Sequence, residues 1–344
     1  MSWYNREGAE GDVVVSSRVR FARNLSDKPF MSRISADDAA EIISRVRGAL
    51  SDEGLEFTDF GDISPVSAAA FADRHEVSPE FARSTLPHAL LRRGGAEEND
   101  DGIGIMLCEE DHLRIQSILP GLALEQAYKN VCRIDDKLGQ RLPIAFDDQL
   151  GYLTGCPTNL GTGMRASVML FLPAVTARRQ IGSLSSSLSK LGLTIRGYYG
   201  EGSDADGCFY QISNQVTLGV DEEETLEKLG RVAAQIIKME REARRAVFSA
   251  DPDAMTDRVR RSLGLLRSAY LLDSAEFLRL SADVRLGIAL GIIDGVDYPT
   301  LGTLLVSVMP ASLTAAAAAE GVGKLDGRQR DLRRAETVRR ALGN

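Results

Sequence analysis

Short apolar runs typical of β-strands occur only in the first two thirds of this 344-residue chain, and this distribution constrains the fold more than any other feature of the sequence. Strands are predicted at 103–108, 166–172, 193–199 and 209–218. After about residue 250 only helical patterns remain, at 253–270, 274–293 and 328–342. Because the length also exceeds that of a usual single domain, we expect an α+β domain over residues 1–248 and an all-α domain over residues 249–344.

Helices are also predicted between the strands. Ser35 and Asp38 form a capping box ahead of an apolar stripe of helical period. Residues 122–138 read as a helix that ends at Gly139, and a long helix over 222–248 carries its apolar residues on one face.

The longest apolar stretch, residues 301–319, approaches the length of a membrane span. Pro310 and several Ser and Thr residues interrupt it, and neither an aromatic belt nor a basic flank frames it. We therefore expect a buried helix, a break at Pro310 and a small-residue connector over 311–323, with no membrane segment.

The charge balance excludes several classes of partner. The 41 Lys and Arg residues are outnumbered by 49 Asp and Glu residues, which gives a net charge of −8. Such a balance argues against a protein that coats nucleic acid or an anionic membrane surface. Four Cys residues do not make a disulfide scaffold, and no apolar targeting segment opens the sequence, so we expect a cytoplasmic protein.

No Walker A or HExxH motif is present, but four segments combine charge with glycine or with buried strands. In residues 13–24 (VVVSSRVRFARN), Arg18 and Arg20 alternate along a predicted strand and so point to one face. In residues 108–117 (CEEDHLRIQS), a buried strand runs into three consecutive acids and then Arg114. Taken alone, an exposed edge strand explains the first segment better than a site does, and a loop of solvated charge is also the commoner explanation of the second.

The other two segments are rich in glycine. In residues 151–173 (GYLTGCPTNLGTGMRASVMLFLP), a turn at Cys156 leads to Arg165 at the mouth of a strand. Glycine lets backbone approach a ligand closely and arginine binds phosphate in a bidentate manner, although an ordinary turn fits this segment equally well. In residues 195–215 (IRGYYGEGSDADGCFYQISNQ), Arg196 leaves a strand and Glu201 lies between two glycines.

Taken together and in this order, the four segments resemble the catalytic domain of the phosphagen (ATP:guanido) kinase family. The chain is most similar to one branch, the bacterial protein arginine kinases (McsB family). The predicted strand with Arg18 and Arg20 lies almost at the N-terminus, without the small helical domain that precedes it in the small-molecule kinases of the family. Near the C-terminus, residues 330–335 (RDLRRA) resemble the phosphoarginine-binding motif RDxxRA of that branch.

This resemblance implies a phosphagen-kinase-like catalytic domain, with an antiparallel sheet flanked by helices, followed by an all-α C-terminal domain. It implies transfer of the γ-phosphoryl group of ATP to arginine side chains of proteins, with Mg²⁺. The residues that would bind ATP are Arg18, Arg20, His75, Arg114, Arg165 and Arg196. For His75, a structural role explains the sequence nearly as well.

The same resemblance assigns Glu110, Glu201 and Cys156 to catalysis. A guanidinium group has a pKa above about 12 and no free lone pair, so an acceptor arginine must be oriented and must lose a proton. Two carboxylates, Glu110 and Glu201, could do both, with Glu110 as the base. Cys156 would orient the cationic substrate, and Glu109 would contact magnesium through water. One departure is Cys108, which stands where the family usually has Asn.

In the C-terminal domain the resemblance implies an allosteric phosphoarginine site at Arg330, Asp331 and Arg334, and dimerisation. Without the motif, this segment would be a solvated basic helix. The implied partners are protein substrates with exposed arginines, a second copy of the chain, an activator protein and a Clp-type unfoldase–protease that degrades the marked proteins in protein quality control. The alternatives are a free-arginine phosphagen kinase and a non-catalytic phosphoarginine-binding adaptor.

Overall fold

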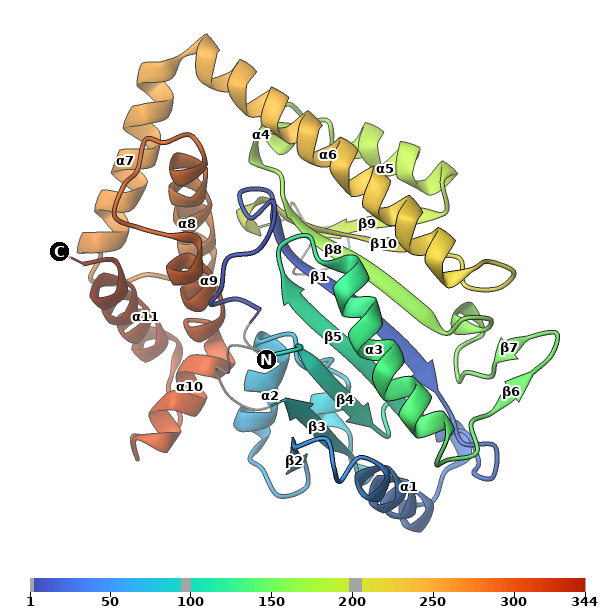
Figure 1. The fold of residues 1–344 in the computed structure, drawn as a ribbon. Helices are drawn as coiled ribbons and strands as arrows, with labels where there is room; N and C mark the ends of the chain where they lie inside the picture. The colour runs from blue at the N-terminus through green and yellow to red at the C-terminus, as the bar shows by residue number, and fades with distance from the viewer. Residues whose placement is uncertain (1–2, 94–99, 198–205, 344) are drawn as a thin grey trace.

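A computed structural model describes residues 3–93, 100–197 and 206–343 of the chain (Figure 1). Its large sheet contains β1 Val14–Arg23, β2 Leu55–Asp59, β3 Ala89–Arg93, β4 Ile103–Leu107, β5 Leu113–Pro120, β8 Met164–Phe171, β9 Leu193–Gly197 and β10 Phe209–Asn214. A separate small hairpin contains β6 Phe146–Asp147 and β7 Gly151–Tyr152.

The helices fall into two groups along the chain. Those among the strands are α1 Ala36–Ala49, α2 Pro65–Asp73, α3 Leu124–Gly139, α4 Pro173–Ala177, α5 Ile181–Lys190 and α6 Glu222–Ala250. Those that follow are α7 Pro252–Ser268, α8 Ser274–Ala289, α9 Tyr298–Ser307, α10 Pro310–Ala319 and α11 Gly327–Leu342. The mixed α+β class, with a sheet flanked by helices and a helical C-terminal part, is thereby confirmed.

The strands of the large sheet lie in the order β2-β3-β4-β5-β1-β8-β10-β9, and every neighbouring pair is antiparallel. β1 lies near the middle, with β5 on one side and β8 on the other. Because side chains alternate between the two faces of a strand, this pairing register decides which side chains of different strands share a face.

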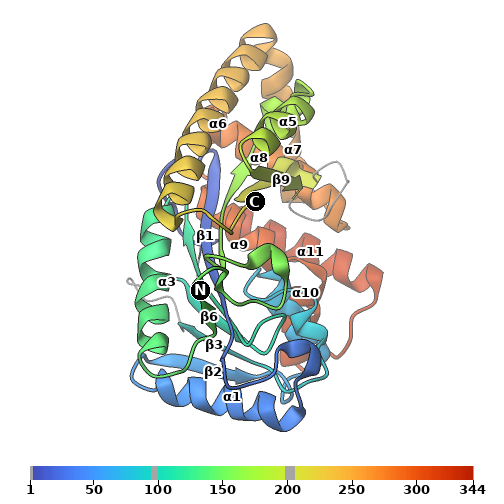
Figure 2. The same cartoon turned by 90° about the vertical axis from the view of Figure 1, so that its right-hand side faces the viewer.

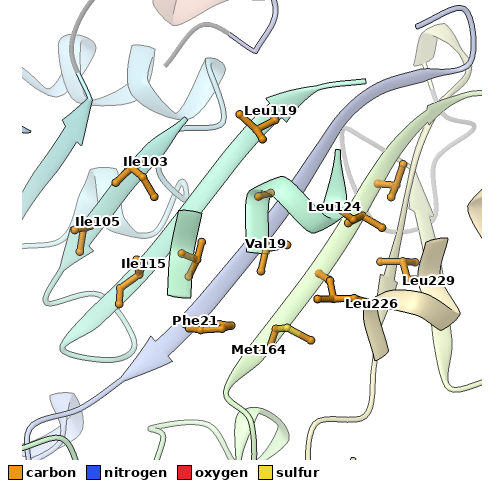
Figure 3. Packing of buried hydrophobic residues seen from close by; sticks show 14 of the residues in the cluster. Val19, Phe21, Ile103, Ile105, Ile115, Leu119, Leu124, Met164, Leu226 and Leu229 are labelled. Carbon is orange, nitrogen blue, oxygen red and sulfur yellow. The ribbon is translucent and has the colours of Figure 1, made fainter. Parts of the chain in front are cut away.

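One face of the sheet is apolar and forms the main core. Val19 and Phe21 of β1 share this face with Ile115 of β5 and Met164 of β8. Helices α3 and α6 lie across this face in Figure 1, and Leu124, Leu226 and Leu229 project from them onto the strands (Figure 3). The opposite face of the same strands is therefore the one that remains for polar side chains.

The C-terminal helices form a second core with part of that opposite face. Met169 and Phe171 of β8 and Ile118 of β5 pack in one apolar cluster with Trp3 and with residues of α7 to α11. Figure 2 shows α7 to α11 gathered beyond the sheet, on the side away from α3. The helical part thus covers one end of this face, and α2 covers its β3–β4 part, where Leu90 and Met106 pack in an apolar cluster with Ala68.

The structure corrects the prediction for residues 311–323. Residues 310–319 form α10 instead of a connector, and α10 packs against α2, where the Ser312 N–H donates to the Asp73 carboxylate at 2.8 Å. The predicted strand over 209–218 ends at Asn214, and strands β2 and β3 and helix α2 were not predicted.

No single helix in the described ranges is long and apolar enough to cross a membrane. Helices α9 and α10 would reach that length and composition only as a pair, and the chain bends by 77° between them.

Candidate active site

Arginine side chains of several strands gather on the polar part of this face, on β1, β5 and β8. Arg18 and Arg20 of β1 share that face, and Arg20 lies directly opposite Arg165 of β8. Arg114 of β5 lies opposite Ala22, two residues from Arg20 and therefore on the same face. A cavity of about 250 Å³ is lined by Arg18, Arg20, Arg165, Ser167, Arg196, Gly197 and Gln211. The register of three antiparallel pairs brings these cations together.

The arginines of this face repel one another in the absence of an anion. Burial and the neighbouring charges of Arg114, Arg18 and Arg165 hold the pKa of Arg20 well below its ordinary value. The pKa of Arg165 is also lowered, by burial and by Arg196 and Arg114. A polyanion such as a triphosphate would remove this repulsion and accept charge-assisted hydrogen bonds, so the face is suited to bind one.

A smaller cavity adjoins the first and shares Arg18, Ser167 and Gln211 with it. Its other walls include Trp3, His75, Ile118 and Met169, a mixture of aromatic and apolar groups, and its volume of about 20 Å³ has room for about one water molecule. The Trp3 indole donates to the Arg74 carbonyl at 3.2 Å and meets His75 edge-on at 6.3 Å. His75 therefore lies beside the arginine face, and its role in nucleotide binding stays a prediction.

His75 should make the stability of the chain depend on pH. Burial and Arg18 lower its pKa to about 3, against 6.5 for the ordinary side chain. Between these values the unfolded chain binds a proton that the folded chain does not, so stability falls as the pH drops below 6.5. In His75→Gln we expect the free energy of unfolding, measured with urea from pH 7 to pH 5, to fall less steeply as the pH drops. The slope against pH should differ from that of the wild type by the equivalent of up to about one bound proton. Equal slopes in the two proteins would contradict the burial of a neutral imidazole.

The acidic turn between β4 and β5 places three carboxylates around Arg114. Arg114 pairs with Glu109 at 2.5 Å, with Glu110, and with Asp111 at 3.8 Å. The side chains of Glu109 and Asp111 are 8% and 0% exposed, whereas that of Glu110 is 47% exposed. Only Glu110, of these three acids, can therefore meet a second molecule without rearrangement.

Cys108 begins this turn in the left-handed region, with φ at +62°. Asparagine tolerates that conformation better than most residues, which gives a physical reason for the Asn that the family usually has there. In this chain the thiol is buried, lies 3.7 Å from the Ala39 carbonyl, and has its pKa raised by burial to about 12. The sulfur therefore points into the core below the turn, away from the side on which Glu110 is exposed.

The Gly-rich loop that carries Cys156 is fastened to the acidic turn by Asp111. One oxygen of its carboxylate accepts the Gly155 N–H at 2.6 Å and the Asn24 amide at 2.7 Å. Cys156, the next residue, is half-buried at the start of a short 3-10 helix, with Sγ 3.1 Å from the Thr158 hydroxyl. The contact through Asp111 brings Cys156 and Glu110 together across 46 residues of sequence.

A second anchor of this loop is Arg23, whose side chain is only 1% exposed. It forms a bidentate pair with Asp135 of α3, donates to the Thr162 carbonyl at 3.0 Å and lies 3.4 Å from the centre of the Tyr152 ring. Arg23 thus joins β1, α3 and both ends of the Gly-rich loop.

We expect Gly155→Ala to disturb the loop and the acidic turn together. A Cβ atom at residue 155 would lie 2.6 Å from the backbone oxygen of Glu110, so one of the two segments must move. Because displacements of about 1 Å in a site cost about a hundredfold in rate, kcat should fall by roughly that factor while the melting temperature changes little. Gly182→Ala is the control, since its Cβ would meet no neighbouring atom. Equal kcat values for the two variants would contradict the coupling.

Glu109 has limited capacity to hold a metal ion directly. Its two oxygens accept the Ser78 hydroxyl at 2.8 Å and the Glu110 N–H at 2.8 Å, and the second also pairs with Arg114. Across the residues that the structure describes, no group of three or more His, Cys, Asp and Glu side chains could enclose a metal. The contact of Glu109 with magnesium through water therefore stays a prediction.

Of the three residues predicted to bind phosphoarginine, Arg334 is the most enclosed. Its side chain is 1% exposed and donates to the carbonyls of Val308 and Leu272 at 2.9 and 2.8 Å, and to Asp331 at 2.7 Å. Arg330 donates to the Leu325 carbonyl at 3.0 Å. The motif therefore ties α11 to the segments before α8 and after α9. Its binding role stays a prediction, and so does that of Glu201, which lies outside the described residues.

Another cavity, of about 700 Å³, lies between α4, α6, α7 and α8. Its main cations already face acids: Arg258 pairs with Asp283 at 2.6 Å, and Arg244 pairs with Glu240 at 2.7 Å. In this respect it differs from the sheet face, where burial and neighbouring arginines lower the pKa values of Arg20 and Arg165.

Sequence reasoning missed the residues that hold the site in shape: Trp3, Asn24, Arg23, Asp111 and Gly155. In the sequence Asp111 is only the last of three consecutive acids, and its contacts lie 87 and 44 residues away. The only local signal was an acid close to the end of a predicted buried strand. Such a signal does not identify the residue that the acid contacts.

Two family models match the chain in succession. The ATP:guanido phosphotransferase C-terminal catalytic domain matches residues 39–243, and the C-terminal domain of protein-arginine kinase McsB matches residues 252–344. Curated protein-arginine kinases from Pelotomaculum thermopropionicum and Bacillus subtilis are 42% and 40% identical to the chain. Each match covers 99% of this chain, and 96% and 93% of the respective relative.

Solved structures agree with the fold. The duplicated taurocyamine kinase of Schistosoma mansoni with bound transition state analog components superposes with a TM-score of 0.59 at 23% identity, over 67% of this chain and 33% of that one. A lombricine kinase superposes with a TM-score of 0.58 at 22% identity, over 69% and 68% of the two chains. At this identity the likeness shows the fold alone.

Proposed function

Since the chain belongs to the bacterial protein-arginine kinases (McsB family), a branch of the ATP:guanido phosphotransferases, we propose that it transfers the γ-phosphoryl group of ATP to arginine side chains of proteins at the arginine face of its sheet. The observation that carries this assignment of the site is the half-exposed carboxylate of Glu110 beside Arg114, at the edge of a cluster of arginines. The cluster supplies a phosphate site, and Glu110 supplies a base next to it.

The arginines would act by position and charge. Phosphoryl transfer develops charge on the equatorial oxygens of the γ-phosphoryl group. It also requires the attacking nitrogen, the phosphorus and the leaving oxygen to lie in line. Arg20 and Arg165, opposite each other on adjacent strands, can hold that group from two sides. Arg18 extends the contact toward His75, in the direction of the base. Magnesium bound to the phosphates would neutralise part of their charge.

Glu110 would prepare the acceptor. The incoming guanidinium must give up a proton before its nitrogen has a lone pair to attack phosphorus. Glu110 accepts this proton, the N–P bond forms, the bond between the γ-phosphorus and the β,γ-bridging oxygen breaks, and ADP leaves with that electron pair. The proposal gives Glu201 the second grip on the guanidinium and gives Cys156 a modulating role in orienting it.

The proposal also divides the chain into a kinase domain, residues 1–248, and a helical domain, residues 249–344. The turn at Asp251, where α6 ends and α7 begins, and the gap between the two family models support this boundary. We assign to the helical domain a homodimer contact and an allosteric phosphoarginine site at Arg330, Asp331 and Arg334. An activator protein and a Clp-type protease that recognises the marked proteins complete the proposal, with the cytoplasm as its location. These finer parts rest on resemblance to the family.

One assay tests the activity. The chain is incubated with Mg-ATP and either casein or free arginine, and phosphoarginine is detected without acid because the N–P bond is acid-labile. Transfer to casein that disappears in Glu110→Gln and in Glu201→Gln supports the proposal. Transfer to free arginine alone would make the chain a phosphagen kinase, and binding of phosphoarginine without any transfer would make it an adaptor.

A further inference from the structure

Exposed apolar side chains gather next to the Gly-rich loop of the proposed active site. Among the described residues, eleven large apolar side chains are classed as exposed. Five of them lie on two short segments, 146–150 and 215–224: Phe146, Leu150, Val216, Leu218 and Val220, with exposed fractions of 58%, 43%, 47%, 48% and 37%. We call these five side chains the apolar rim.

The two segments of the rim meet across one glycine. The Leu150 carbonyl accepts the Gly161 N–H at 2.8 Å, and a Cβ atom at Gly161 would lie 2.7 Å from the Cα of Leu218. Gly161 has φ at +96°, a conformation that glycine adopts without strain. Because glycine has no Cβ atom, the backbones of both segments can approach it closely. In Figure 1 the β6–β7 hairpin and the start of α6 lie at the same end of the large sheet. The rim is therefore carried by two segments that touch at Gly161.

The rim is joined to the turn that carries Cys156. The Thr217 hydroxyl, between Val216 and Leu218, donates to the Thr158 carbonyl at 2.9 Å, and Thr158 in turn contacts the Cys156 sulfur. The segment that carries Val216 and Leu218 is therefore held directly against the turn that carries Cys156.

The charge of the same two segments is uniformly negative. They contain Asp147, Asp148, Asp221, Glu222, Glu223 and Glu224, and neither contains Lys or Arg. Acids interspersed with apolar side chains complement a chain that carries both basic and apolar residues. A second copy of this chain is disfavoured, because a two-fold contact would place these six acids against their own copies.

We propose that the apolar rim docks an extended segment of the protein substrate, with apolar and basic side chains flanking the target arginine. Such sequences are buried in folded proteins and become accessible when a protein unfolds, so the rim would favour unfolded substrates. This inference rests on the proposed function, because it identifies which part of a protein reaches that same site.

The test uses two fluorescein-labelled 15-residue peptides with one central arginine, flanked either by Leu, Val and Lys or by Ser and Gly. Affinities are measured without ATP by fluorescence anisotropy, and KM and kcat with Mg-ATP. In the double variant Leu150→Ser/Leu218→Ser we expect Kd and KM for the apolar peptide to rise about tenfold. The kcat, the KM for ATP and the constants for the Ser-Gly peptide should stay as in the wild type.

Two further variants sharpen the result. Tyr270→Ser removes a side chain that is 71% exposed on the helical part, and it should leave every constant unchanged. Glu223→Gln/Glu224→Gln should weaken the salt dependence of binding to the Lys-containing peptide, because two charges of the rim are lost.

Several outcomes would overturn the docking surface: no preference of the wild type for the apolar peptide, equal losses on both peptides, or loss of an oligomer in Leu150→Ser/Leu218→Ser, which would assign the rim to a second copy. Failure of the proposed function looks different. In that case anisotropy still shows the preference and its loss in the double variant, while neither peptide is phosphorylated by the wild type.

Discussion

Replacing Glu110 by glutamine should lower the kcat of arginine phosphorylation by about a thousandfold while leaving the chain folded. Glutamine keeps the shape of the side chain and its contact with Arg114, but it cannot accept a proton from the substrate guanidinium. Because the Glu110 side chain is 47% exposed and caps no helix, its loss should shift the melting temperature by less than about 2 °C. Initial rates on casein and a thermal melt measure the two effects.

The matched control is Glu227→Gln, an exposed glutamate on α6 outside the site. It should retain the rate and the stability of the wild type. If Glu110→Gln kept more than a tenth of the wild-type kcat, Glu110 would not be the base, and Glu201 would become the candidate.

Replacing Arg20 by methionine should have opposite effects on activity and on stability. Arg20 faces Arg165 at the position proposed for the γ-phosphoryl group, so its loss should lower kcat/KM for ATP by about a thousandfold. Without nucleotide, however, burial and the like charges of Arg114, Arg18 and Arg165 hold the pKa of Arg20 well below its ordinary value. Removing it should raise the stability of the free protein by about 1 kcal/mol, or about 2–4 °C in melting temperature.

Thermal melts with and without Mg-ATP separate these two effects. The wild type should gain more stability from the nucleotide than Arg20→Met does, because binding relieves a repulsion that the variant lacks. Arg178→Met, at an exposed position after α4, is the control and should change neither quantity. A lower melting temperature for Arg20→Met without nucleotide would show that this arginine is structural.

The strands of the site were more predictable than the contacts that shape it. Alternation in β1 is a local pattern, so the amino-acid sequence alone places Arg18 and Arg20 on one face. The pairing of β1 with β8 adds Arg165 opposite Arg20, and no local pattern specifies which strands pair. For this reason the sequence could identify the arginines one by one but could not show that they share a cavity.

The supporting contacts were not predictable from periodicity. Arg23 and Asp135 are 112 residues apart, and Asp111 and Gly155 are 44 apart, so only the tertiary fold brings them together. Helix α10 was missed for a different reason. Its sequence is almost uniformly small, and without an apolar stripe it reads as a connector, although its packing on α2 stabilises it as a helix. Strands β2 and β3 are short and mix charged with apolar residues, which also weakens their signal.

A structure of the chain with Mg²⁺ and a non-hydrolysable ATP analogue would test the central claim most directly. We expect the γ-phosphate within hydrogen-bonding distance of Arg20 and Arg165, the base beside His75, and the Glu110 carboxylate turned toward the open side of the γ-phosphate. A triphosphate bound instead in the larger cavity between α4, α6, α7 and α8, or bound away from Arg20 and Arg165, would contradict the assignment of the arginine face as the active site.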